Sequence, residues 1–308
     1  MMRVLVTGGA GFIGGRLVQS ADAEFRFTPV GRNVGGTKTV INWTDTASIA
    51  ALCKQHDAIV HLAAMNEQDS AKDPASAQRV NVDYTRNLLA SAEAVGVKRF
   101  VYLSTSKVFG GNLHGDIDES SAPSPINQYA ITHHLAERLV LSETGKSNLQ
   151  RGVLRLSNAV GEPADPRANV WMLIANDLCR QAATDGRIKL ASSGLAWRNF
   201  IAMTDVVAAI RHILKLPVPI LADGMFHLGG IASLRIYDLA SLVARRAEVL
   251  LGHAVSIDRA APLDGEQFPT LNWRIEKLMA TGWAPVAQIE KEIDRTLLMC
   301  QKKFAASA

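Results

Sequence analysis

The sequence has few of the residues that build a covalent or metal-based framework. Its three cysteines, Cys53, Cys179 and Cys300, lie far apart in the chain and form no CxxC pair. We therefore expect neither a disulfide framework nor a cysteine-based zinc site. The eight histidines show no HExxH or HxH spacing, so no metal site is expected. This cysteine usage is typical of a reducing cytosol and predicts a cytoplasmic protein.

Long apolar runs and strong charge of one sign are also absent. No apolar stretch approaches the ~18 residues that cross a bilayer, and the first residues do not resemble a signal peptide. The 33 basic residues exceed the 29 acidic ones only slightly, and no run of five like charges occurs. These features argue against secretion, a membrane partner and nucleic-acid binding. A chain of 308 residues with 48% hydrophobic residues can instead bury a large globular core.

Short apolar segments alternate with helical patterns through the first half of the chain. Strands are expected at 4–6, 25–30, 58–62, 99–103 and 152–156, and helices at 12–20, 46–55, 75–95 and 128–142. Because parallel strands are joined by crossover helices, this alternation predicts an α/β protein with a doubly wound parallel sheet.

The pattern becomes less regular after Asn158. A stretch rich in Gly, Pro and Asp at 161–169 is typical of a boundary loop. Strands are expected at 188–190, 198–201 and 225–228, and helices near 172–184, 205–214, 236–251, 273–279 and 286–303. We expect a first domain over residues 1–160 and a smaller, mainly substrate-binding domain over 161–308, with segments near 198–229 returning to the first domain.

A glycine-rich loop follows the first strand directly and opens the first helix. Its glycines stand at positions 8, 11 and 14 of the segment TGGAGFIG. Glycine permits the tight turn, lets backbone N–H groups approach a pyrophosphate, and allows close packing of helix on strand. The loop therefore predicts a Rossmann-type dinucleotide-binding fold.

The end of the second predicted strand bears on the choice of cofactor. The residues there are Val30-Gly31-Arg32-Asn33, without the carboxylate that would hold both ribose hydroxyls of NAD. Arg32 has the charge to pair with a 2′-phosphate, which favours NADP and leaves NAD possible. The alternative interpretation is that Arg32 is a solvated surface residue.

Motifs follow one another in order along nearly the whole chain. They are 7–14 (TGxxGxxG), 61–64 (HxAA), 81–82 (NV), 104–110 (SSxxVYG), Tyr129 (the YxxxK tyrosine), 155–161 (RxxNxxG), 198–206 (RDFIxxxDV), 226–229 (NxG) and 282–285 (GWxP). Together they resemble an enzyme family, the extended short-chain dehydrogenase/reductases of the nucleotide-sugar epimerase/dehydratase group, with likeness to UDP-glucose 4-epimerases.

The resemblance implies binding sites and partners. It places the cofactor against Gly8, Gly11, Phe12, Ile13, Gly14, Asn42, Trp43, Leu62, Ala63, Ala64, Asn81, Tyr129 and His133, in addition to Arg32, which its charge assigns to the cofactor site. It implies a nucleotide-diphosphate sugar as substrate, held by Asn158 and Arg198, with Lys107 also near the substrate. It also implies a homodimer formed through helices such as 75–95 and 128–142.

The resemblance implies that Thr105 hydrogen-bonds the reacting sugar oxygen and that Tyr129 is the general acid/base. The chain departs from the family at His133, which stands where the family has a lysine that supports the tyrosine phenolate. Three interpretations remain open. His133 replaces the lysine with a more acidic pH optimum, Lys107 supplies the missing cation, or the protein binds cofactor without turnover.

The reaction type is narrowed by the residues after Thr105. Dehydratase relatives carry an acidic pair there, whereas this chain has Ser106-Lys107, which disfavours 4,6-dehydration. The family resemblance then favours a nucleotide-sugar epimerase. An NADPH-dependent nucleotide-sugar 4-ketoreductase is the first alternative, and a catalytically weak dinucleotide-binding scaffold or sensor is the second.

Overall fold

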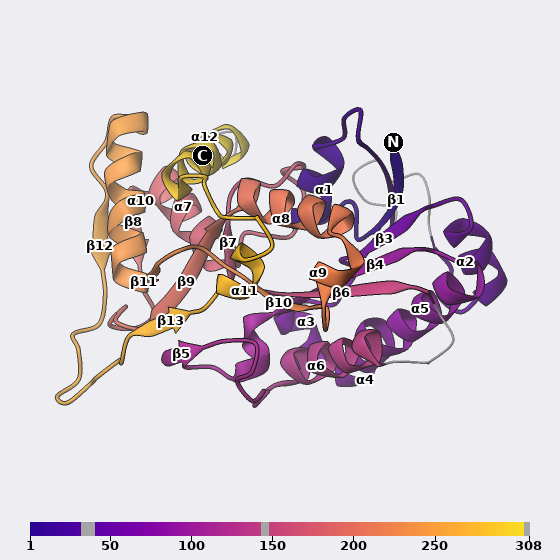
Figure 1. Ribbon diagram of the computed structural model, residues 1–308. Helices are drawn as coiled ribbons and strands as arrows, with labels where there is room; N and C mark the ends of the chain where they lie inside the picture. Colours follow the sequence, from indigo (N-terminus) through magenta and orange to yellow (C-terminus); the bar gives the residue numbers. More distant parts are fainter. Residues whose placement is uncertain (32–40, 143–147, 305–308) are drawn as a thin grey trace.

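The protein is described by a computed structural model that covers residues 1–31, 41–142 and 148–304. Its centre is a six-stranded parallel sheet with the strand order β10-β6-β4-β3-β1-β2 (Figure 1). The strands are β1 (Met2–Thr7), β2 (Phe25–Val30), β3 (Ala58–His61), β4 (Arg99–Thr105), β6 (Gln150–Leu156) and β10 (Met225–Leu228). The predicted α/β class with a Rossmann-type doubly wound sheet is confirmed.

Both faces of the sheet are apolar, as buried parallel strands require. In β1 the side chains of Val4 and Val6 pack into one core cluster, whereas Leu5 between them packs into another on the opposite face. The helices covering the two faces are α1 (Phe12–Gln19) and α8 (Met203–Lys215) on one side, and α2 (Thr46–Cys53), α5 (Tyr84–Ala94) and α6 (Gln128–Leu141) on the other.

The second half of the chain contributes β10 to this sheet and builds smaller sheets beyond it. A three-stranded sheet has the order β11 (Ser233–Arg235), β9 (Trp197–Ala202) and β7 (Asn158–Val160). Two further pairs are β12 (Ser256–Asp258) with β8 (Arg187–Lys189), and β13 (Leu271–Trp273) with β5 (Gly115–Ile117). A third core cluster joins α7 (Ile174–Asp185), α10 (Ile236–Leu251) and α12 (Ile289–Phe304) on the left of Figure 1.

Two helix predictions differ from the structure. The predicted helix at 75–95 is three segments, namely α4 (Pro74–Gln78), a π-helical turn η1 (Arg79–Asp83) and α5, and a short helix α3 (Glu67–Lys72) precedes them. The predicted helix at 273–279 is wrong in its first residues, because Trp273 ends β13 and stacks on His227 at a ring distance of 4.0 Å. Only α11 (Glu276–Met279) is helical there. Among the described residues, no helix has the length and apolarity to cross a membrane.

Candidate active site

The loop between β1 and α1 leaves no space for side chains at its glycines. Gly8 has a φ of +67°, and a Cβ added there would lie 2.9 Å from the backbone nitrogen of Ala63. A Cβ added at Gly14 would lie 2.3 Å from the carbonyl oxygen of Gly8. Larger residues at either position would therefore push apart the backbone of the loop, the first helix and the segment after β3.

The N-terminus of α1 fits the pyrophosphate of a dinucleotide. The helix begins after Gly11, its N-cap, and among the described residues no side chain caps it and none in its first turn is acidic. Unpaired N–H groups and the helix dipole both favour an anion at such an end. The loop at 8–11, with Phe12 and Ile13 in the first helical turn, therefore could hold the cofactor's phosphates.

A chain of hydrogen bonds fixes the segment that follows β3 beside this loop. The Thr7 hydroxyl lies 2.6 Å from Nδ1 of His61 and accepts the N–H groups of Leu62 and Ala63 at 3.2 Å. Nε2 of His61 lies 2.8 Å from the hydroxyl of Thr85. Burial lowers the pKa of His61 to about 3, so the ring is neutral and acts as a structural link.

Asn81 supports the same segment from behind. Its Oδ1 accepts the N–H of Met65 at 2.8 Å, and its Nδ2 donates to the hydroxyl of Thr132 at 2.9 Å. The buried amide thereby joins the segment that includes exposed Ala64 to α6. Contact of Asn81 and Ala64 with the cofactor stays a prediction.

The residues expected near the adenine have local partners. Oδ1 of exposed Asn42 accepts the N–H and the hydroxyl of Thr44 at 3.2 and 2.9 Å. Trp43 stacks on Tyr84, with ring centroids 5.3 Å apart and planes at 5°. Their contact with a cofactor stays a prediction. Arg32, the predicted NADP-selecting residue, lies outside the described residues.

Thr105 and Tyr129 meet at the carboxyl end of β4. Thr105 is the last residue of the strand, and Tyr129 lies in the first turn of α6, whose N-cap Asn127 accepts the N–H of Ala130 at 2.9 Å. The Thr105 side chain interacts with the Tyr129 phenol and favours its ionised form. Burial has the larger, opposite effect and raises the pKa of Tyr129 to about 12. At neutral pH the phenol is protonated and can donate a proton.

His133 lies one helical turn after Tyr129 and brings no positive charge to it. Its Nδ1 lies 2.9 Å from the carbonyl oxygen of Tyr129, so Nδ1 carries the hydrogen and Nε2 is left as an acceptor. The two rings are 4.2 Å apart. Burial lowers the pKa of His133 to about 4, against the opposing effects of this hydrogen bond and of the Glu137 charge. The ring is therefore neutral at pH 7.

Lys107 is near the pair but is itself paired. It lies in a 3₁₀ turn, η2 (Ser106–Phe109), and its N–H donates to the Thr105 hydroxyl oxygen at 3.2 Å. Its Nζ lies 2.6 Å from Oε2 of Glu67, the first residue of α3. Sequence reasoning missed Glu67, because α3 has Ala71 as its one apolar residue and so lacks an apolar period. The only sequence signal is its position, six residues after His61 at the end of β3.

A buried ion pair anchors α6 to the sheet beneath this site. Arg155 of β6 binds both carboxylate oxygens of Glu137, from Nε at 3.0 Å and from Nη2 at 2.9 Å. The two side chains are 6% and 1% exposed. A charge left alone at this depth would be costly, so the pair holds the helix that carries Tyr129 in one position.

The two residues predicted to bind the nucleotide part of a substrate share the three-stranded sheet. Asn158 of β7 donates to the carbonyl oxygen of Asn199 in β9 at 2.9 Å. Arg198 of β9 is partly buried, and its Nη1 donates to the carbonyl oxygen of Trp197 at 2.8 Å. None of the described carboxylates forms an ion pair with Arg198, so its guanidinium is available to an anion. Among the described residues, no hydrogen bond or ring contact joins either one to Tyr129.

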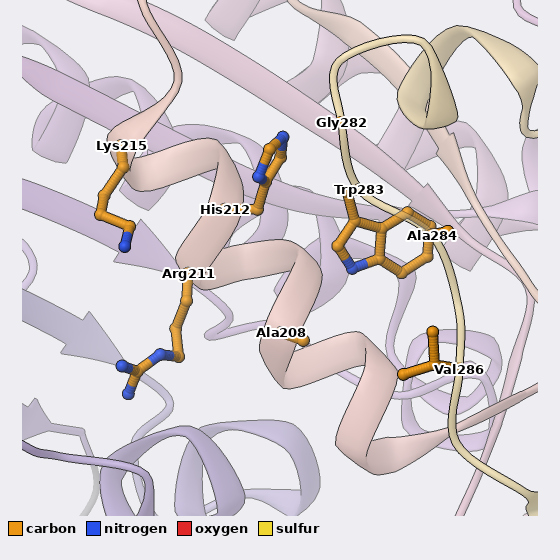
Figure 2. A pocket seen from close by; sticks show the side chains of 8 residues that line it. All are labelled: Ala208, Arg211, His212, Lys215, Gly282, Trp283, Ala284 and Val286. Carbon is orange, nitrogen blue, oxygen red and sulfur yellow. The ribbon is translucent and has the colours of Figure 1, made fainter.

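A cavity of about 500 Å³ between α8 and the segment 282–286 is a separate feature (Figure 2). Arg211 and Lys215 of α8 line it together with Trp283, as labelled in Figure 2. Both cations are already paired, Arg211 with Asp22 and Lys215 with Glu24. Neither Thr105 nor Tyr129 lines this cavity, so it is not the candidate active site.

A second cavity, of about 440 Å³, is lined in part by Leu195, which is close in sequence to Arg198. It is lined by Leu195, Arg235, Glu266, Gln267, Phe268 and Pro269. The Trp197 indole N–H donates to the carbonyl oxygen of Phe268 at 3.1 Å, and the Arg235 guanidinium lies 5.2 Å from the Trp197 ring. This cavity therefore adjoins the strand that carries Arg198.

Known proteins resemble the chain over most of its length. Human dTDP-D-glucose 4,6-dehydratase is 26% identical over 328 aligned residues, which cover 98% of this chain and 91% of that protein. UDP-glucose 4-epimerase of Rhizobium leguminosarum bv. trifolii is 32% identical over 180 residues, 54% of this chain and 55% of that enzyme.

The fold has close counterparts among solved structures. RMD from Pseudomonas aeruginosa, solved in complex with NADPH, superposes with a TM-score of 0.79 at 24% identity, covering 98% of this chain and 100% of that one. The profile of the NAD dependent epimerase/dehydratase family matches residues 4–229. The resemblance predicted from the motifs is thus confirmed, and the chain belongs to the NAD dependent epimerase/dehydratase family of extended short-chain dehydrogenase/reductases.

Proposed function

We propose that this chain is an NAD(P)-dependent oxidoreductase of nucleotide-diphosphate sugars and that it works as a ketoreductase. When bound, the nicotinamide supplies the hydride that is added to a sugar keto carbon. Tyr129 gives a proton to the keto oxygen, and Thr105 hydrogen-bonds the same oxygen and orients it. The observation that carries this proposal is that Thr105, at the end of β4, interacts with the Tyr129 side chain in the first turn of α6, whose phenol burial holds protonated.

The protonation state of Tyr129 supports the reductive direction. A reductase starts its turnover with a neutral phenol that donates a proton. An epimerase begins by oxidising a hydroxyl group, for which the tyrosine must be a phenolate. With a pKa of about 12, only about 10⁻⁵ of the protein carries a Tyr129 phenolate at pH 7, and His133 supplies no charge that would increase this fraction.

Arg198 supports a substrate that carries a diphosphate. A planar guanidinium can bind two phosphate oxygens at once. Among the described residues, Arg198 donates only one hydrogen bond, to the carbonyl oxygen of Trp197. Asn158 lies on the neighbouring strand and presents an amide close by. We assign the cavity beside β9 to the nucleotide base, where Arg235 and Phe268 offer a cation and an aromatic ring.

The cofactor site supports a nicotinamide dinucleotide of either kind. We propose that the loop at 8–11 and the first turn of α1 hold the pyrophosphate, because no side chain caps this helix end and because Gly8 and Gly14 let the loop pack closely on the segment after β3 and on α1. The preference for NADP rests on Arg32, and NAD remains the alternative.

A nucleotide-sugar epimerase is the second candidate. The similarity to a UDP-glucose 4-epimerase, at 32% identity over 180 residues, favours it. The same two residues would serve, with Tyr129 first taking and then returning a proton. This candidate requires a cation from elsewhere to stabilise the phenolate, since His133 is neutral.

Measuring cofactor oxidation and sugar conversion in the same reaction distinguishes the ketoreductase from the epimerase. Purified protein is incubated with NADPH or NADH and a panel of UDP-, dTDP- and GDP-linked 4-keto sugars, and absorbance at the reduced nicotinamide band is recorded. A ketoreductase consumes one reduced cofactor for each sugar reduced. An epimerase converts the corresponding hydroxyl sugars with no net consumption of reduced cofactor. That result would contradict the ketoreductase and support the epimerase.

A further inference from the structure

Glu67 touches the two segments that carry the reactive side chains. It stands at the first position of α3, and its side chain is 43% exposed. One carboxylate oxygen, Oε2, lies 2.6 Å from Nζ of Lys107. The other, Oε1, accepts a hydrogen bond from Nδ2 of Asn127 at 2.8 Å. Both oxygens are therefore occupied, each by a different element of the fold.

Lys107 contacts Thr105, and Asn127 caps the helix that carries Tyr129. The Lys107 backbone N–H donates to the hydroxyl of Thr105 at 3.2 Å. Asn127 caps α6 through the N–H of Ala130, and Tyr129 lies in the first turn of that helix. A single carboxylate thus joins the turn after β4 to the start of α6, which are 20 residues apart in sequence.

Glu67 also acts on Tyr129 through its charge. The titratable groups near the phenol are Glu67 of α3, Lys107 of η2, Tyr102 of β4, and His133 and Glu137 of α6. Burial keeps Tyr102 and His133 neutral, and Arg155 binds Glu137. Glu67 is thus the charged side chain that acts on the phenol, and Lys107 is its ion-pair partner. The Glu67 charge adds to burial in raising the pKa of Tyr129.

We propose that Glu67 is a positioning residue for the reaction: its carboxylate holds Lys107 and the α6 N-cap together, which places the charged Glu67–Lys107 pair beside the segments that carry Thr105 and Tyr129. This inference rests on the proposed function in one respect, because it gives the tuned phenol the role of proton donor. The pair takes the place of the family lysine as the charged element beside the tyrosine, with a net charge near zero instead of one positive charge.

If Glu67 and Lys107 act on Tyr129 through their charges, removing one or the other should shift the pKa of Tyr129 in opposite directions. Glu67→Gln removes a negative charge, so the phenolate becomes easier to form and the pKa of Tyr129 falls, by about one. Lys107→Met leaves the Glu67 carboxylate without its cation, so the pKa of Tyr129 rises. In the double variant both charges are gone, and the value returns toward that of the unaltered chain. A purely structural clamp would be loosened by either change and would move the pKa the same way in both.

The ionisation of Tyr129 is measured without substrate by ¹⁹F NMR of full-length protein containing fluorinated tyrosine. Fluorination lowers the phenol's own pKa, which brings the titration into a range where the chain stays folded, and circular dichroism at each pH verifies the fold. Tyr129→Phe assigns its signal among the four tyrosines. Glu24→Gln is the matched control, because Glu24 forms a similarly exposed pair with Lys215, 3.0 Å from Nζ, at the edge of β2.

We expect Glu67→Gln and Lys107→Met to shift the Tyr129 titration to lower and to higher pH respectively, and Glu24→Gln to leave it in place. Shifts of the same sign, or no shift in either variant, would overturn the proposal. The titration needs no turnover, so these outcomes are independent of the proposed function. If the two variants shift the titration in opposite directions but the protein reduces no keto sugar, the role of Glu67 stands and the proposed ketoreductase function is wrong.

Discussion

Placing a lysine at position 133 should restore a positive charge beside Tyr129. His133 is 3% exposed, lies 4.2 Å ring to ring from Tyr129, and is neutral because burial lowers its pKa to about 4. A lysine there has its ammonium one helical turn from the phenol, on the same face of α6. A cation within ~4–6 Å favours the charged phenolate and lowers a phenol pKa by about one to three.

The size of the effect follows from the pKa of about 12 that burial gives Tyr129. A decrease of about two brings the value near 10 and raises the phenolate fraction at pH 7 about 100-fold. In the pH–rate profile for oxidation of a nucleotide-sugar alcohol, the rising limb should move to lower pH by the same amount. The fluorotyrosine signal of Tyr129 should shift in parallel when no substrate is present.

His134→Lys is the matched control for this experiment. It adds the same charge one residue further along α6, where the side chain is 26% exposed and His134 lies 3.2 Å from a carboxylate oxygen of Glu137. We expect this variant to leave the Tyr129 titration nearly unchanged. An unchanged titration in His133→Lys, or an equal shift in His134→Lys, would refute the reasoning that a missing cation at position 133 sets the state of the phenol.

Three further predictions concern stability and cofactor binding. Glu137→Gln leaves Arg155 without its buried counter-charge and should lower the free energy of unfolding in urea by about 3 to 5 kcal/mol. The control is Asp57→Asn, which removes the exposed ion pair with Arg3 and should lower the free energy of unfolding by only a small part of that amount. Between pH 7 and pH 5 the unfolded chain takes up a proton at His133 that the folded chain, with a pKa of about 4, does not. Stability should therefore fall by about 2 kcal/mol from this group, and His133→Gln should remove that part of the slope in urea unfolding at the two pH values. Gly14→Ala places a methyl group 2.3 Å from the Gly8 carbonyl oxygen and should weaken NAD(P)H binding more than tenfold in a fluorescence titration, and an affinity within twofold of the unaltered chain would contradict the role of the loop.

The sheet could be predicted from the sequence because its signals are local. Strand β10 was expected at 225–228 and spans Met225–Leu228, since three of its four residues are apolar and glycines stand on both sides of it. The glycines of the first loop likewise carry their constraint in their own backbone, as the φ of Gly8 shows.

The electrostatics of the site could not be predicted in the same way. The sequence gives His133 an ordinary histidine pKa, and only burial among Tyr129, Tyr102 and neighbouring groups makes it neutral down to about pH 4. Glu67 meets Lys107 across 40 residues and Asn127 across 60, and no local pattern encodes such contacts. Polar helices such as α3 have no apolar period, so the sequence does not reveal them.

The central claim is that Tyr129 donates a proton during hydride transfer to a nucleotide-linked keto sugar. Its most direct test follows the oxidation of NADPH and NADH by the unaltered chain and by Tyr129→Phe, with the panel of nucleotide 4-keto sugars. We predict that the unaltered chain consumes reduced cofactor with at least one sugar, and that the variant still binds cofactor but reacts about 10²- to 10⁴-fold more slowly. Cofactor binding without any sugar-dependent oxidation, or full activity in Tyr129→Phe, would contradict the account.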